Sequence, residues 1–113
     1  MNRDDEATLD PDDWAQARAL AHRAVDDAID HLARVRERAA WREPPADVRR
    51  ALDVPLPQGP TPLAEVYREF GENVRPYPMG NVHPRFWAWF MGAGSFTGAL
   101  ADFLAAVDGS NLG

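Results

Sequence analysis

Apolar residues recur at helical spacing through the first third of the chain. Trp14, Ala21, Ala28 and Val35 follow one another every seven residues, with polar residues on either side. The same stripe also contains Val25, Leu32 and Ala39. The spacing predicts a long amphipathic helix within residues 10–42. At about 28 residues it would be roughly 40 Å long, too long to bury itself in a small domain. We therefore expect it to dock on a partner subunit, with an ordinary core helix as the alternative.

The boundaries of this helix are indicated by local signals. Residues 1–9 are polar and predict a disordered tail. Asp10 is a suitable N-cap and Pro11 suits the first helical position. Pro44 and Pro45 cannot continue a helix, and the residue before a proline is disfavoured in the α region. The helix is therefore expected to end just before these prolines.

Residues 43–80 are predicted to form a proline-rich connector with short helices. Residues 46–52 favour one short helix, whereas four prolines within 54–62 predict an extended segment. Thr61 and Pro62 are expected to begin a second short helix, and residues 75–80 are expected to be non-helical. The apolar face of the second helix would consist of Leu63, Val66, Tyr67 and Phe70.

The last part, residues 81–113, is apolar and is expected to line a pocket and to form a helix. Residues 86–113 carry two charges, and six of the eleven aromatic residues lie within 86–103. Such a surface is expected to be buried. Ser95 is a suitable N-cap for a helix over 96–107. Its apolar positions would be Phe96, Ala99, Leu100, Phe103, Leu104 and Val107.

Two other interpretations of this apolar region are weaker. A membrane span over 86–107 is disfavoured because Asp102 and several glycines interrupt it. The small residues at 92–95 resemble a phosphate-binding turn, but no strand precedes them and no lysine follows. We expect a plain tight turn there and no contact with a membrane.

Length and charge narrow the class of protein. A chain of 113 residues forms one domain at most, and the pattern predicts a mainly α fold. A net charge of −6 argues against binding to nucleic acid. The N-terminal residues contain no apolar run typical of a secretory signal, so a cytoplasmic location is expected.

The residue types present exclude several chemistries for this segment. The chain contains no cysteine, and all twelve basic residues are arginine, so no lysine is available for a Schiff base. His22, His31 and His83 lack the spacing of a metal site. No G-x-S-x-G motif is present. We therefore predict no catalytic residue and no metal or cofactor ligand within these residues.

One stretch carries a resemblance to a known family. It begins His83-Pro84-Arg85-Phe86, continues through an aromatic-rich run and a small-residue turn, and ends with the helix that follows Ser95. This order resembles the N-terminal region of the group II pyridoxal-phosphate-dependent amino acid decarboxylases. Their pattern is H-P-x-F, an aromatic stretch, a small-residue turn and a helix of the form L-A-(D/E)-x-L. The proline-rich connector is also similar to the family's connector, so that the resemblance covers about residues 10–113.

The resemblance implies a fold and a role. The chain would be a helical arm and the start of a transferase-type fold like that of aspartate aminotransferase, with the large cofactor-binding domain absent. It would supply contacts to a homodimer partner or to the missing large domain, and part of the wall of the substrate pocket. The positions matching the segment that touches the substrate are Trp89, Phe90, Met91 and Gly92. The substrate would be an amino acid, with aromatic amino acids as candidates, and pyridoxal 5′-phosphate would be the cofactor of the parent enzyme.

The chain also departs from the family. Several members have Pro-Thr where this chain has Met91-Gly92, so a hydroxyl contact to the substrate does not carry over. The family's cofactor-binding histidine, aspartate and lysine belong to the large domain, so this segment would be catalytically incomplete alone. Arg85 could pair with a substrate carboxylate or form a surface ion pair. The substrate stays open, as does the choice between decarboxylation and oxidative or deaminating chemistry. The alternative function is a stand-alone helical interaction module.

Overall fold

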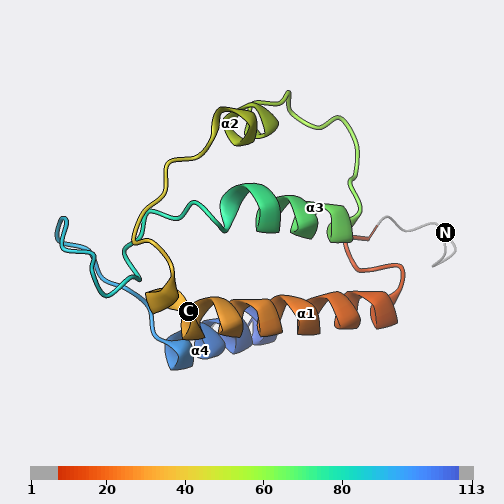
Figure 1. Cartoon of the computed structure of the whole chain (residues 1–113). Coiled ribbons are helices and arrows are strands. Elements are labelled where there is room, and N and C mark those ends of the chain that lie inside the picture. The colour runs from red at the N-terminus through yellow and green to blue at the C-terminus, as the bar shows by residue number, and fades with distance from the viewer. Residues whose placement is uncertain (1–7, 110–113) are drawn as a thin grey trace, which may run out of the picture.

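The chain folds into α-helices joined by long irregular segments (Figure 1). The computed structural model describes residues 8–109, and no strand occurs among them. The predicted mainly α class is therefore confirmed. The predicted tail at 1–9 falls outside the described residues except for Thr8 and Leu9, and the last residues of the predicted apolar segment, 110–113, lie outside them as well.

Helix α1 (Trp14–Ala33) begins later than the sequence predicts. Asp13, not Asp10, is its N-cap, and one oxygen of the Asp13 carboxylate accepts from the backbone N–H groups of Ala15 and Gln16, at 2.9 and 3.0 Å. These two donors would otherwise lack partners in the first turn. The capping role predicted for Asp10 was therefore wrong.

The same helix also ends earlier than expected. It stops at Ala33, and a short 3₁₀ turn, η2 (Val35–Glu37), follows before the chain becomes extended. The guanidinium of Arg38 donates to the carbonyl oxygen of His31 at 2.7 Å, which satisfies one of the free acceptors in the last turn. Because the chain turns back at this point, α1 has 20 residues, and the prediction of one helix over 10–42 was wrong.

The face of α1 that packs inward is not the predicted stripe. Trp14 and Val25 from that stripe are 67% and 49% exposed. The half-buried positions instead follow another line along the helix: Ala17, Leu20, Ala24, Asp27 and His31. This face lies along helix α3 (Leu63–Glu69), which runs beside α1 in the same direction (Figure 1). Polar contacts join the two helices, since Asp27 and Arg23 of α1 both contact Tyr67 of α3.

The connector has the organisation that the sequence predicts. Helix α2 (Ala46–Leu52) and helix α3 are both present, and residues 54–62 are irregular. Thr61 does not cap α3, since Pro62 occupies the N-cap position without a side-chain hydrogen bond. A π-helical turn, η3 (Phe70–Val74), extends α3 and contacts α2. Among the described residues, Val48 of α2 is the one buried hydrophobic side chain.

Helix α4 (Phe96–Asp108) confirms the predicted C-terminal helix. The Ser95 hydroxyl accepts from the backbone N–H of Gly98 at 3.1 Å, as expected for an N-cap, and Gly109 ends the helix in the left-handed region at φ 58°. No turn is present at residues 92–95, and Ser95 itself has an extended backbone, so the predicted tight turn was wrong. Every residue of α4 is exposed within this chain, including the apolar ones that were expected to be buried.

The arrangement is open for a chain of this length. The Cα radius of gyration is 17.7 Å, whereas a compact domain of this size has about 13 Å. The accessible surface is 10163 Å², against about 6,200 Å² for a folded monomer of this mass. Much apolar surface is therefore left uncovered. Among the described residues, no helix has both the length and the apolar character needed to cross a bilayer.

Candidate functional site

The loop that precedes the aromatic segment is fixed by one buried histidine. His83 is 7% exposed, and its Nε2 lies 3.0 Å from the backbone carbonyl oxygen of Arg38. The backbone N–H of Arg85 donates to His83 Nδ1 at 3.0 Å. Since Nδ1 accepts, Nε2 is the nitrogen whose proton is donated to the Arg38 carbonyl oxygen. The loop is thereby attached to the segment that follows α1.

Gly80 allows the two segments to approach closely. Its φ is +95°, a conformation that favours glycine, and a Cβ at this position would overlap the carbonyl oxygen of Ala40. The Gly80 carbonyl accepts from the backbone N–H of His83 at 2.9 Å, and the His83 carbonyl accepts from Phe86 at 3.0 Å. Consecutive turns thus lead the chain from Gly80 to Phe86.

These turns and the segment after α1 enclose an apolar hollow of about 490 Å³ that is open to solvent. The Phe86 and Trp89 rings lie 6.1 Å apart between centroids, with their planes at 52°. Trp89 has φ 55°, which is uncommon for a large side chain and is found most often where surrounding structure imposes it. The lining residues are Trp41, Met79, Phe86, Ala88 and Trp89. An aromatic or aliphatic group of a ligand is the chemistry that suits this hollow.

The structure separates the four residues predicted to contact a substrate. Trp89 lines the hollow, whereas the Phe90 side chain is fully exposed and Met91 is 46% exposed. The carbonyl oxygen of Gly92 accepts from the side-chain amide of Asn81 at 3.2 Å, which holds the end of the aromatic segment near the preceding turn. The four residues therefore do not converge on one cavity within this chain.

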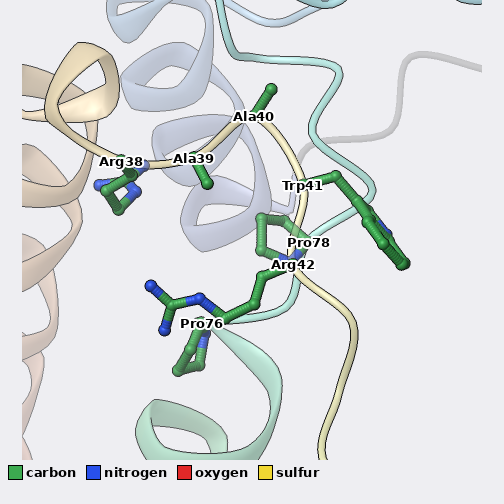
Figure 2. Close-up of a pocket in the computed structure, with 7 residues that line it drawn as sticks. All are labelled: Arg38, Ala39, Ala40, Trp41, Arg42, Pro76 and Pro78. Carbon is green, nitrogen blue, oxygen red and sulfur yellow. The ribbon is translucent and has the colours of Figure 1, made fainter.

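A smaller cavity of about 80 Å³ lies beside the hollow and shares Trp41 with it (Figure 2). It is lined by Arg38, Ala39, Ala40, Trp41, Arg42, Pro76 and Pro78. Figure 2 shows the Trp41 ring directed away from the side on which the Arg42 side chain extends toward Pro76. The cation of Arg42 is thus not placed to pair with a group bound against the Trp41 ring.

A polar cluster joins α1 to α3 beyond these cavities. The Tyr67 hydroxyl donates to the Asp27 carboxylate at 2.5 Å, and Arg75 lies 3.9 Å from the same carboxylate oxygen. The guanidinium groups of Arg23 and Arg75 lie 5.4 and 5.7 Å from the centroid of the Tyr67 ring, and Arg75 also lies 5.0 Å from that of Phe70. Hydrogen bonding and cation–π contacts therefore hold this helix pair together in the absence of a large apolar core.

His31 lies at the end of this cluster and is bonded to Arg38. A guanidinium nitrogen of Arg38 is 3.1 Å from His31 Nε2, and because arginine can only donate, Nε2 must accept. Burial is the first cause that lowers the pKa of His31 from its usual value of 6.5, and the positive charges of Arg38 and Arg75 lower it further. Both effects favour the neutral ring.

Metal and cofactor binding can be judged from the residue types of the described chain. Residues 8–109 contain no group of three or more histidine or acidic side chains suited to a metal ion. The chain has no lysine to bind pyridoxal phosphate covalently, so its residues do not fit that cofactor. The Arg85 side chain is exposed and forms no ion pair with the rest of the described chain, so neither role considered for it is filled here. What the arrangement offers is an apolar binding surface.

Sequence reasoning missed several residues that form the site. Trp41 and Met79 lie 38 residues apart in the sequence, and no periodic pattern connects them. A usable signal was the Gly80 to His83 stretch, in which a glycine and a His-Pro pair follow a proline-rich passage and mark a constrained turn.

Comparison with known proteins returns no relative. No family model, curated protein or solved structure matches the chain. A proposal for its function therefore depends on the sequence pattern and on the geometry of these residues.

Proposed function

We propose that the chain is the N-terminal portion of a group II pyridoxal-phosphate-dependent amino acid decarboxylase or a close variant of one. It would provide contacts to a dimer partner or to a large domain, and part of the substrate pocket wall. Residues 81–109 would then be the start of a transferase-type fold that is completed by that domain. The missing lysine agrees with this division of roles, since the cofactor would be bound elsewhere.

The observation that carries the proposal is the uncovered apolar surface directly after the His83-Pro84 turn. Trp87 is 92% exposed, Phe90 is fully exposed, and the apolar side of α4 is open to solvent within this chain. Monomeric proteins rarely leave such contiguous apolar areas uncovered. A second subunit or domain seated here would cover the surface and would close the hollow beside Trp89.

The hollow supports an amino acid with an apolar or aromatic side chain as the substrate class. Its lining presents three aromatic rings and no charged group. A ring bound against Trp89 would gain buried apolar area and edge-to-face contacts. The lining of the hollow offers no charged partner for the carboxylate and amino groups of such a substrate.

The test begins with the gene. The coding sequence in frame with this chain, or next to it, is expected to encode a large domain containing a His-Lys pair. The complete assembly, supplied with pyridoxal phosphate, is expected to release carbon dioxide from one or more aromatic L-amino acids. Trp89→Ala should raise KM for the aromatic substrate about tenfold or more through lost ring contacts, whereas Trp89→Phe, which keeps an aromatic ring at the same position, is the matched control.

Two results would overturn the proposal. One is the absence of any cofactor-binding domain in frame or in a neighbouring gene. The other is a complete assembly that consumes no amino acid by decarboxylation, oxidation or deamination. In either case the alternative of a helical interaction module would apply, and α4 would be the first segment to examine for a partner.

A further inference from the structure

Arg38 lies between two histidines that come from distant parts of the chain. Its guanidinium donates to the carbonyl oxygen of His31 at 2.7 Å and lies 3.1 Å from His31 Nε2. Its own carbonyl oxygen accepts from His83 Nε2 at 3.0 Å. One residue therefore links the end of α1 to the loop before the aromatic segment.

Each of the two histidines also uses one ring nitrogen as a hydrogen-bond acceptor. His31 Nε2 accepts from the Arg38 guanidinium, and His83 Nδ1 accepts from the Arg85 backbone N–H. A second proton on His31 would place a cation and a donor against the Arg38 guanidinium. A second proton on His83 would place one N–H directly against another. Either event replaces a hydrogen bond by a repulsive contact.

The surrounding charges do not compensate for protonation. Arg38 and Arg75 are the cations that act on His31. The carboxylate of Asp27, one turn before His31 on α1, already accepts from Tyr67 and lies beside Arg75. Around His83, the charged residues that contribute contacts are Arg38 and Arg85, through their backbone groups. These contacts include no acidic group that would stabilise a charged ring.

We propose that His31, Arg38 and His83 form an acid-sensitive latch that holds the apolar hollow together while both rings are neutral. Trp41 follows Arg38 by three residues on one side of the hollow, and Phe86 follows His83 by three on the other. A proton on His31 Nε2 displaces the Arg38 guanidinium from the end of α1. A second proton on His83 leaves its bond to the Arg38 carbonyl in place but breaks the bond from the Arg85 N–H, so the turn that leads to Phe86 loosens. The hollow then loses its fixed shape, and with it the capacity to bind a ligand. The inference does not depend on membership of the decarboxylase family.

The test is hydrogen exchange followed by mass spectrometry on the full chain at about pH 7.5 and about pH 5.5, corrected for intrinsic exchange rates. In the wild type, amides within 34–42 and 80–90 are expected to lose protection together at the lower pH, by about tenfold or more. Glutamine can donate and accept in these positions without titrating. The double variant with His31→Gln and His83→Gln should therefore keep its protection at both pH values.

His22→Gln is the matched control, since His22 is exposed on α1 and should leave the acid response of the wild type intact. Equal protection of the wild-type segments at the two pH values would overturn the latch, as would an undiminished acid response in the double variant. If the double variant does not fold, ¹⁵N NMR of the wild-type imidazole rings at about pH 7.5 reports which nitrogen of each ring carries the proton. The latch requires the proton on Nδ1 of His31 and on Nε2 of His83, and any other protonation state of either ring refutes it.

Discussion

The hydroxyl of Tyr67 on α3 and the carboxylate of Asp27 on α1 are joined by a 2.5 Å hydrogen bond across 40 positions of sequence. Tyr67→Phe keeps the ring and its cation–π contacts but removes this bond, so we expect a loss of about 1 kcal/mol in the free energy of unfolding. Urea denaturation followed by circular dichroism measures the change. Tyr77→Phe is the control, since no hydrogen bond of the Tyr77 hydroxyl is found within residues 8–109. Equal effects of the two substitutions would contradict the role assigned to Tyr67.

Gly80 forms a second contact between distant parts of the sequence, because its backbone lies directly against that of Ala40. Gly80→Ala should destabilise the chain by roughly 2 kcal/mol or more, because the new methyl overlaps the Ala40 carbonyl and φ is +95°. Gly71→Ala, where nothing lies within 4 Å of the added Cβ, should be close to neutral. Thermal unfolding of the two variants gives the comparison. A neutral Gly80→Ala variant would mean that the 80–86 loop does not lie against the segment after α1.

These two contacts show why the local elements could be predicted from the sequence and the site could not. The short helices at 46–52 and 63–69 and the helix that begins after Ser95 follow from proline positions, capping residues and helical spacing. No periodic pattern in the sequence indicates the pairing of Tyr67 with Asp27. It lies on a face of α1 other than the predicted apolar stripe, and spacing alone cannot reveal which face is used.

The length of α1 also depends on a contact that the sequence pattern does not reveal. Arg38 turns back to bond His31, and this ends the helix well before Pro44, although nothing in helix propensity disfavours continuation through residues 34–42. Trp41 reaches the hollow only because of that early end. Of the predicted site residues, Trp89 alone shares the hollow with it, since the positions of the other three depend on how residues 90–92 extend away.

The start of α1 gives a direct comparison between the predicted and the observed cap. Asp13→Ala should cost about 1 kcal/mol, because the N–H groups of Ala15 and Gln16 lose their acceptor. Asp10→Ala should have a much smaller effect, since α1 begins at Trp14. Both substitutions remove one negative charge, so that the change in net charge is matched. The far-ultraviolet circular dichroism signal and the unfolding midpoint report the difference, and a larger effect at Asp10 would refute the observed boundary.

Acid should weaken the fold through His31. The pKa of His31 is lowered in the folded chain, first by burial and then by Arg38 and Arg75, whereas in the unfolded chain it keeps its usual value of 6.5. As the pH falls below 6.5, the unfolded chain binds the proton first, so the free energy of unfolding decreases until the folded ring is also protonated. Above pH 6.5 this contribution is constant. Urea midpoints measured across this range should fall more steeply for the wild type than for His31→Gln, and parallel curves would contradict the shift.

The uncovered apolar side of α4 makes a prediction about the chain in isolation. Leu100 and Phe103 are 49% and 55% exposed there, and each would contribute about 1.5–3 kcal/mol if fully buried in an interface. The isolated chain should therefore self-associate and bind a hydrophobic dye. Replacing both residues by glutamate should weaken the association about tenfold or more.

The matched control is the double replacement of Ala101 and Ala105 by glutamate, which adds the same charge to the opposite side of α4. Sedimentation velocity over a range of concentrations, together with dye fluorescence, separates the two variants. The apolar-face variant should be largely monomeric, whereas the control should associate nearly as strongly as the wild type. A wild-type chain that stays monomeric, binds no dye and melts sharply would show that the exposed face needs no partner, and the missing-domain argument would then lose its physical basis.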